Sequence, residues 1–121
     1  MAVIALLAVP LATAPRASAQ DGESVKVVAT FSILADWVQQ VGGERVEVVT
    51  IVPAGGDAHA FDPNPDQVGQ IAEADLIFEI GAGCEPWLDD MVTASGSSAQ
   101  RIVVSEGLDL IAATGEGEEY E

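Results

Sequence analysis

The sequence predicts an α/β fold, with a parallel sheet of about four strands and helices on both faces. Short apolar runs alternate with segments in which apolar residues recur every three or four positions, and this alternation is typical of βαβ units. The runs are mostly apolar along their whole length, as expected for strands covered on both faces. With 121 residues and 49% apolar content, the chain has enough material for one core. The predicted strands are 25–29, 46–52, 75–80 and 101–104, and the predicted helices are about 31–41, 64–74 and 86–94.

The first two helices carry recognisable start and stop signals. Thr30 or Ser32 is expected to cap the amino end of the first helix, and Gly42-Gly43 is expected to end it. The second helix is expected to have Asn64 as its N-cap and Pro65 in its first turn, where the missing N–H of proline costs nothing.

The two ends of the chain are expected to lie outside the domain. Residues 1–19 combine an apolar run with Ala17-Ser-Ala19, whose small side chains are typical of the cleavage site of a secretory signal peptide. The run is too short to span a bilayer, so we expect export without stable membrane insertion after cleavage. The domain is then expected to occupy residues 20–113, with 105–113 short helical or irregular, and residues 114–121 are expected to form a flexible acidic tail.

The charge of the chain disfavours some partners. The formal net charge is −16, and residues 1–19 contain one of the four basic residues (Arg16) and none of the 20 acids. Such a field repels nucleic acid and anionic lipid and attracts cations, although plain solubility would explain it equally well. Cys84 is the only cysteine, which excludes an intramolecular disulfide and a C-x-x-C motif.

The only histidine, His59, lies in a loop rich in glycine and proline that follows the second predicted strand. By itself, a lone loop histidine is seldom a metal ligand. Asp57 and Asp62 flank it, and either they orient the imidazole or add a ligand, or they cap turns; we favour turn capping. Cys84 follows the third predicted strand at the same edge of the sheet, and we expect a small buried side chain there rather than a ligand.

Several segments resemble, in the same order, the zinc- and manganese-type solute-binding proteins of ABC importers. The loop around His59 is similar to that family's Gly-x-Asp-x-His-x-(Tyr/Phe)-(Glu/Asp)-Pro-x-Pro pattern, which carries the first metal ligand. The resemblance therefore implies that His59 is a metal ligand. The matching segments are Ala29-Thr-Phe-Ser-Ile-Leu34, Val41-Gly-Gly43, Gly56-Asp-Ala-His-Ala-Phe-Asp-Pro-Asn-Pro65, Ala72-Glu-Ala-Asp-Leu-Ile-Phe78 and Gly81-x-Gly-x-Glu-Pro-Trp-Leu88.

The resemblance also implies a function. Members of the family have two α/β lobes bridged by a long helix, and zinc or manganese binds between the lobes as the transported ligand. The present chain corresponds to the N-terminal lobe, and we expect it to be truncated inside the loop that precedes the next histidine ligand. It would then be a periplasmic or otherwise extracytoplasmic monomer that delivers the metal ion to a membrane permease. In that family Glu85, Pro86 and Trp87 have no ligand role, and we expect them to start and pack the third helix.

The alternative is an exported α/β enzyme domain that binds a phosphate-bearing ligand at the Gly81 turn. Gly81-Ala-Gly83 after a strand imitates the start of a dinucleotide-binding fingerprint, but Pro86 replaces the third glycine and Glu85 would face the phosphates. The sequence also lacks a G-x-S-x-G nucleophile motif. We therefore favour a binding protein over an enzyme.

Overall fold

The computed structural model describes residues 22–111. The expected signal peptide (1–19) and the expected acidic tail (114–121) lie outside the described residues. Within the described range, none of the helices combines the length and the apolar character needed to cross a bilayer.

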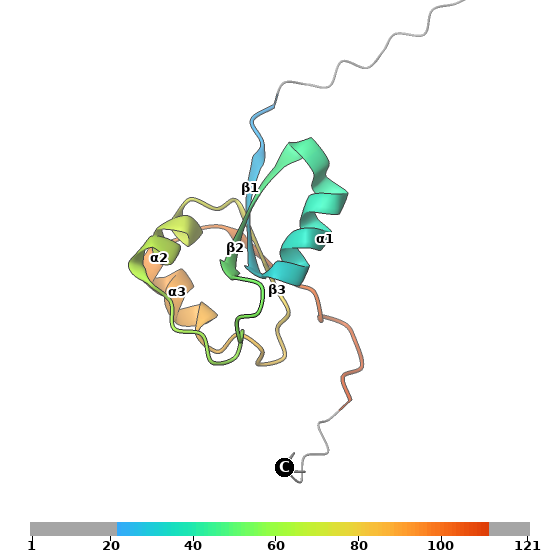
Figure 1. The fold of residues 1–121 in the computed structure, drawn as a ribbon, viewed down its shortest axis with the longest axis vertical. Coiled ribbons are helices and arrows are strands. Elements are labelled where there is room, and N and C mark those ends of the chain that lie inside the picture. The colour runs from blue at the N-terminus through green and yellow to red at the C-terminus, as the bar shows by residue number, and fades with distance from the viewer. Residues whose placement is uncertain (1–21, 112–121) are drawn as a thin grey trace, which may run out of the picture.

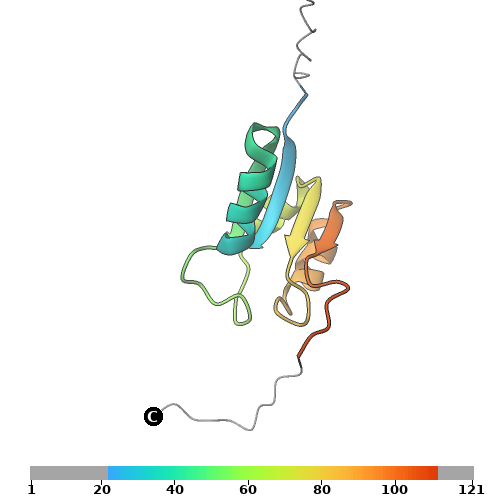
Figure 2. The same ribbon diagram turned by 90° about the vertical axis from the view of Figure 1, so that its right-hand side faces the viewer.

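Four parallel strands form the single sheet of the described chain, as the sequence predicts. They are β1 (Val25–Phe31), β2 (Val46–Val52), β3 (Leu76–Glu79) and β4 (Gln100–Val103), in the order β2-β1-β3-β4. All four strands run in the same direction, so the loops that follow them emerge at one edge (Figure 2).

The helices lie on both faces of the sheet, which confirms the predicted layers (Figure 1). Helix α1 (Ser32–Gly42) covers one face, and α2 (Pro65–Ala72) and α3 (Leu88–Ser95) cover the other. The main core lies on the α2–α3 face, where Val28 and Ile77 pack with residues of both helices. Their neighbours Val27 and Leu76 point to the α1 face and line a groove of about 280 Å³ that also includes Trp37.

The start of α1 differs from the prediction. Its N-cap is Phe31, with no side-chain hydrogen bond, so neither Thr30 nor Ser32 caps the helix. The reason is that β1 continues to Phe31 and Thr30 is buried within the strand, where its hydroxyl bonds to Glu85 instead. The helix does end at Gly42, and Gly43 adopts a φ of 57° that favours glycine.

Other boundaries differ as well, since β3 is one residue shorter at each end than predicted, β4 begins and ends one residue earlier, and α2 ends at Ala72. A short 3₁₀ helix, Gly43–Arg45, was not predicted, and α3 begins at Leu88 rather than Pro86 because the chain is still turning at residues 82–87. Residues 104–107 form a turn and residues 108–111 have no regular structure, so the irregular alternative for this segment is the one observed as far as the description extends.

The start of α2 follows the predicted pattern closely. Asn64 Oδ1 accepts the backbone N–H of Gln67 at 3.1 Å, and Gln67 Oε1 accepts the backbone N–H of Asn64 at 2.9 Å. Such a capping box satisfies two backbone donors that the helix itself cannot use. Gln67 Nε2 also donates to the carbonyl of Ile51 at 2.9 Å, so α2 is joined to the end of β2.

A charged network joins β3, β4 and α3. Arg101 donates to both carboxylate oxygens of Glu79, from Nε at 2.8 Å and from Nη2 at 2.9 Å, and Nη1 donates to Asp89 at 2.6 Å. The Glu79 side chain is only 7% exposed. Its buried carboxylate therefore depends on the guanidinium for charge compensation.

Arg101→Met is expected to lower the free energy of unfolding by about 2–3 kcal/mol, because it leaves the Glu79 carboxylate buried without its cation. Urea denaturation measures this loss. The matched control is Lys26→Met, which removes an exposed ion pair with Glu73 at 3.4 Å and is expected to cost at most about 0.5 kcal/mol. Equal losses in the two variants would contradict this account of the network.

Candidate functional site

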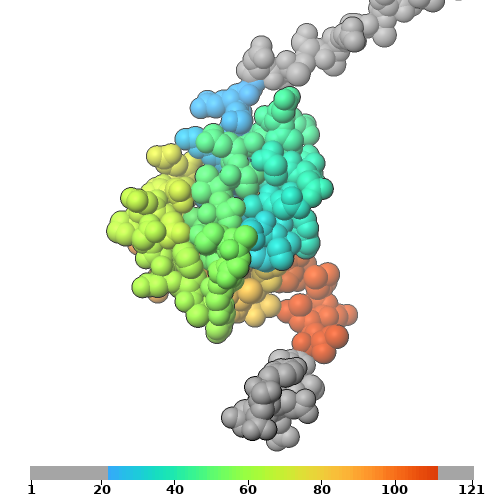
Figure 3. Space-filling model, in the orientation of Figure 1, coloured from blue at the N-terminus to red at the C-terminus, as the bar shows by residue number. Residues whose placement is uncertain are grey.

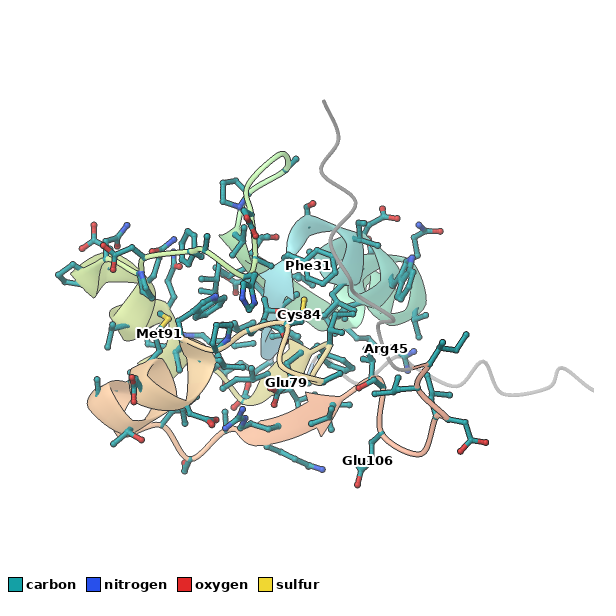
Figure 4. The ribbon with its side chains drawn as sticks, turned by 90° about the horizontal axis from the view of Figure 1, so that it is seen from below. Phe31, Arg45, Glu79, Cys84, Met91 and Glu106 are labelled. Carbon is teal, nitrogen blue, oxygen red and sulfur yellow. The ribbon has the colours of Figure 1, made fainter. Side chains whose placement is uncertain are left out.

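The carboxyl edge of the sheet brings together the loops that the sequence analysis singled out. His59 lies in the loop between β2 and α2, and Cys84 lies in the loop between β3 and α3. Figure 4 looks onto this edge, with Cys84 and Phe31 near its centre. The chain leaves β1 toward one face of the sheet and leaves the adjacent β3 toward the other face. Ligands of open α/β sheets bind at such a topological switch point.

The loop around His59 is shaped by Asp57. Asp57 Oδ1 accepts the backbone N–H of His59 at 2.8 Å and that of Ala60 at 3.3 Å, which is the turn-capping role expected for this carboxylate. Glycine at position 56 lets the start of the loop pass close to the end of β2, because a Cβ there would lie 2.8 Å from a methyl of Val52. The residues of this loop, shown in green, form part of the exposed lower surface in Figure 3. The His59 side chain is exposed, and so is that of Asp62.

Trp87 joins this loop to the body of the domain. Its indole Nε1 donates to the carbonyl of Ala58 at 2.6 Å, and its ring packs edge-on against Phe61, with ring centroids 5.2 Å apart. Trp87 is 8% exposed and belongs to the main core. The residues on either side of His59 are therefore held by one buried side chain.

A buried carboxylate holds the loop between β3 and α3. Glu85 is 8% exposed, and its Oε1 accepts the Thr30 hydroxyl at 2.7 Å and the Ile80 backbone N–H at 2.8 Å. Its Oε2 accepts the Gly81 backbone N–H at 3.1 Å. The backbone N–H groups of Ile80 and Gly81 are therefore already bonded to the chain's own carboxylate, so these two donors are not free for a phosphate.

Cys84 is partly exposed next to these carboxylates. Desolvation by burial raises the pKa of its thiol, and the charges of Glu85 and Asp57 raise it further. A metal ion that bound this thiol would have to displace its proton against the raised pKa, which disfavours Cys84 as a ligand.

The described residues do not contain a complete metal site. Between residues 22 and 111, no group of three or more His, Cys, Asp or Glu side chains is arranged to hold a metal ion. The arrangement instead offers one exposed imidazole on a fixed loop at the edge of the sheet where ligands of such folds bind. It can contribute one ligand to a site that other groups complete.

The comparison with known families agrees with the resemblance of the motifs. The sequence model of the family described as "ZnuA: Zinc-uptake complex component A periplasmic" matches residues 27–121. The chain belongs to this family. Both the His59 loop and the Glu85–Trp87 segment lie within the matched region.

Individual relatives agree with this family assignment. The chain is 35% identical over 109 residues to the manganese-binding lipoprotein MntA of Halalkalibacterium halodurans, an alignment that covers 90% of this chain and 36% of MntA. It is 35% identical over 124 residues to the manganese ABC transporter substrate-binding lipoprotein PsaA of Streptococcus anginosus, covering 98% of this chain and 39% of PsaA.

Two solved structures show the same fold. The Mn-bound periplasmic metal binding protein from candidatus liberibacter asiaticus superposes with a TM-score of 0.70 at 28% identity, over 77% of this chain and 35% of that one. The Zn(II)-bound ZnuA-like domain of Streptococcus pneumoniae AdcA gives a TM-score of 0.66 over 75% of this chain and 34% of that one, and at 21% identity it supports the fold alone. The chain spans little more than a third of the length of the relatives it matches.

Sequence reasoning missed the contacts of Glu85 and Trp87, which it expected only to start and pack the third helix. The structure gives Glu85 three hydrogen bonds and gives the Trp87 indole a bond to the loop around His59. One signal for Glu85 was available, since an acid inside a glycine-rich turn at the end of a buried strand lies beside unpaired backbone N–H groups. The bond between Trp87 and Ala58 spans 29 residues and has no local signal.

The reactivity of Cys84 tests the electrostatics of this edge. Its rate of alkylation by iodoacetamide is expected to rise with pH through a midpoint above the ordinary thiol pKa of about 9, because burial and the two carboxylates disfavour the thiolate. Alkylation in urea provides the control, since there the midpoint should return to the ordinary value. A midpoint below that of the unfolded chain would contradict the described surroundings of the thiol.

Proposed function

We propose that this chain is the N-terminal lobe of an extracytoplasmic metal-binding subunit of an ABC importer. In this role it carries zinc or manganese as the transported ligand and delivers it to a membrane permease. Membership of the family supports this proposal, and so does the similarity to MntA, a manganese-binding lipoprotein, and to PsaA, a substrate-binding lipoprotein of a manganese ABC transporter. In this proposal the protein is exported, acts as a monomer and has no enzymatic activity.

His59 is the proposed metal ligand of this lobe. The observation that supports it best is that the only histidine is exposed on a loop whose backbone is fixed by Asp57 and Trp87. Imidazole nitrogen is a common zinc ligand, whereas manganese favours oxygen donors, so the choice between the two metals depends on the other ligands of the site. The remaining ligands are proposed to come from the polypeptide that relatives carry beyond the matched part.

The alternative of a phosphate-binding enzyme domain is not favoured. Glu85 accepts the backbone N–H groups of Ile80 and Gly81, which a phosphate at this turn would need. Its negative charge would also repel the phosphate.

Replacement of His59 tests the proposed function. The 121-residue chain is expected to bind zinc or manganese with micromolar or weaker affinity, because a high-affinity site needs about four ligands. His59→Ala is expected to weaken this binding by well over tenfold, or more than about 1.4 kcal/mol. Calorimetry at physiological salt, which screens diffuse binding to the acidic surface, measures both affinities.

The fold should survive this substitution, since the imidazole lies in an exposed loop outside the core. The matched control is Asp66→Asn, which removes an exposed acid from the first turn of α2 and should leave the affinity within about twofold. An unchanged metal affinity in His59→Ala, with a normal melting curve, would refute the assignment of His59.

A further inference from the structure

We propose that Trp87 is a positioning residue for His59, which it holds in place by bonding to the loop on one side of the histidine and packing against it on the other. This inference rests on the proposed function, in which His59 binds the metal ion. Trp87 itself does not touch the ion, and it acts by restricting the backbone that carries the imidazole.

The first contact lies immediately before His59. The Trp87 indole donates to the carbonyl of Ala58 at 2.6 Å, a short bond for an N–H donor. Among the hydrogen bonds of residues 22–111, this is the one that joins residues 54–62 to a different part of the fold. The accepting carbonyl belongs to the planar peptide group that joins Ala58 to His59. The bond therefore fixes the orientation of this peptide group, from which the His59 backbone follows.

The second contact lies two residues after His59. The rings of Phe61 and Trp87 meet at an interplanar angle of 61°, an edge-to-face arrangement that aromatic pairs prefer. Phe61 is partly buried and packs against the main core of the domain. Together the two contacts confine the short segment in which His59 stands.

Asp57 acts differently from Trp87. Among the described residues its carboxylate bonds only to the backbone of His59 and Ala60, within the same loop, so it sets the shape of the turn but not its place relative to the sheet. The place of the turn depends on Trp87, because this residue is buried and its own position is fixed.

The fixed position of Trp87 follows from its neighbours. Glu85, two residues earlier, is bonded to Thr30 of β1 and to the backbone at the end of β3. Leu88, the next residue, is fully buried in the core. The loop around His59 is therefore connected to the sheet in two steps. Glu85 bonds to β1 and to the end of β3, and Trp87, two residues later, bonds to Ala58.

Trp87→Phe tests the proposal, since it removes the N–H donor but keeps an aromatic ring against Phe61. Backbone ¹⁵N relaxation of residues 58–61 is expected to show a clear drop in order parameter. The affinity of zinc, followed by the NMR signals of the single imidazole, is expected to fall about tenfold, as for other groups that orient a metal-bound histidine. The matched control is Trp37→Phe, because Trp37 is the other tryptophan and is 55% exposed on the α1 face. It should change neither quantity.

The outcomes separate this proposal from the proposed function. An unchanged loop order in a folded Trp87→Phe variant would overturn the proposal, and so would a looser loop with unchanged zinc affinity. If zinc left the imidazole of the unmodified chain unperturbed, the proposed function would fail, and the relaxation data alone would then decide whether Trp87 holds the loop. If Trp87→Phe did not fold, Phe61→Ala would remove the second contact from the loop side, with a looser loop supporting the proposal and an unchanged one overturning it.

Discussion

The carboxyl edge of the sheet depends on the hydrogen bonds that the buried Glu85 carboxylate accepts. A buried carboxylate is stable only when hydrogen-bond donors surround it, and here the donors come from β1 and from the end of β3. The same bonds connect β1 with the end of β3 at the topological switch point. They also set where the following turn delivers Trp87, and through it the loop that carries His59. One satisfied polar group therefore links the sheet to the candidate ligand.

This arrangement suits a binding protein that takes up and releases a metal ion. Between residues 22 and 111 the lobe places a single imidazole on a restrained loop beside a thiol whose pKa is raised, and no group of three metal-ligating side chains is arranged to hold an ion. A site completed by groups from elsewhere can open again when those groups move away. A site whose ligands come from separate parts would suit a family member that releases its ion to a permease, which is consistent with the proposed function.

The sheet and most of the helices could be predicted because their signals are local. Apolar runs indicated the strands, and apolar residues at three- and four-residue spacing indicated the helices. The strand β2 was predicted at its observed bounds, Val46–Val52. The Asn64–Pro65 start of α2 and the Gly43 end of α1 were read from capping chemistry. The predicted cap of α1 was wrong, because Thr30 bonds to Glu85, which lies 55 residues away in the sequence. The motif around His59 gave a candidate ligand, but the contacts that hold it are long-range and have no periodic pattern.

The zinc-edge X-ray absorption spectrum of the 121-residue chain, loaded with less than one equivalent of zinc at physiological salt, is the sharpest test of His59 as the metal ligand of this lobe. The chain has one histidine and one cysteine, so the scattering from the outer atoms of an imidazole ring and the scattering from a directly bound sulfur each report on a single residue. If His59 binds the ion, the spectrum will show imidazole scattering with the ring nitrogen at about 2.0–2.1 Å and oxygen ligands around the zinc. A shell of oxygen alone, or a sulfur ligand at about 2.3 Å without imidazole scattering, would contradict the assignment of His59.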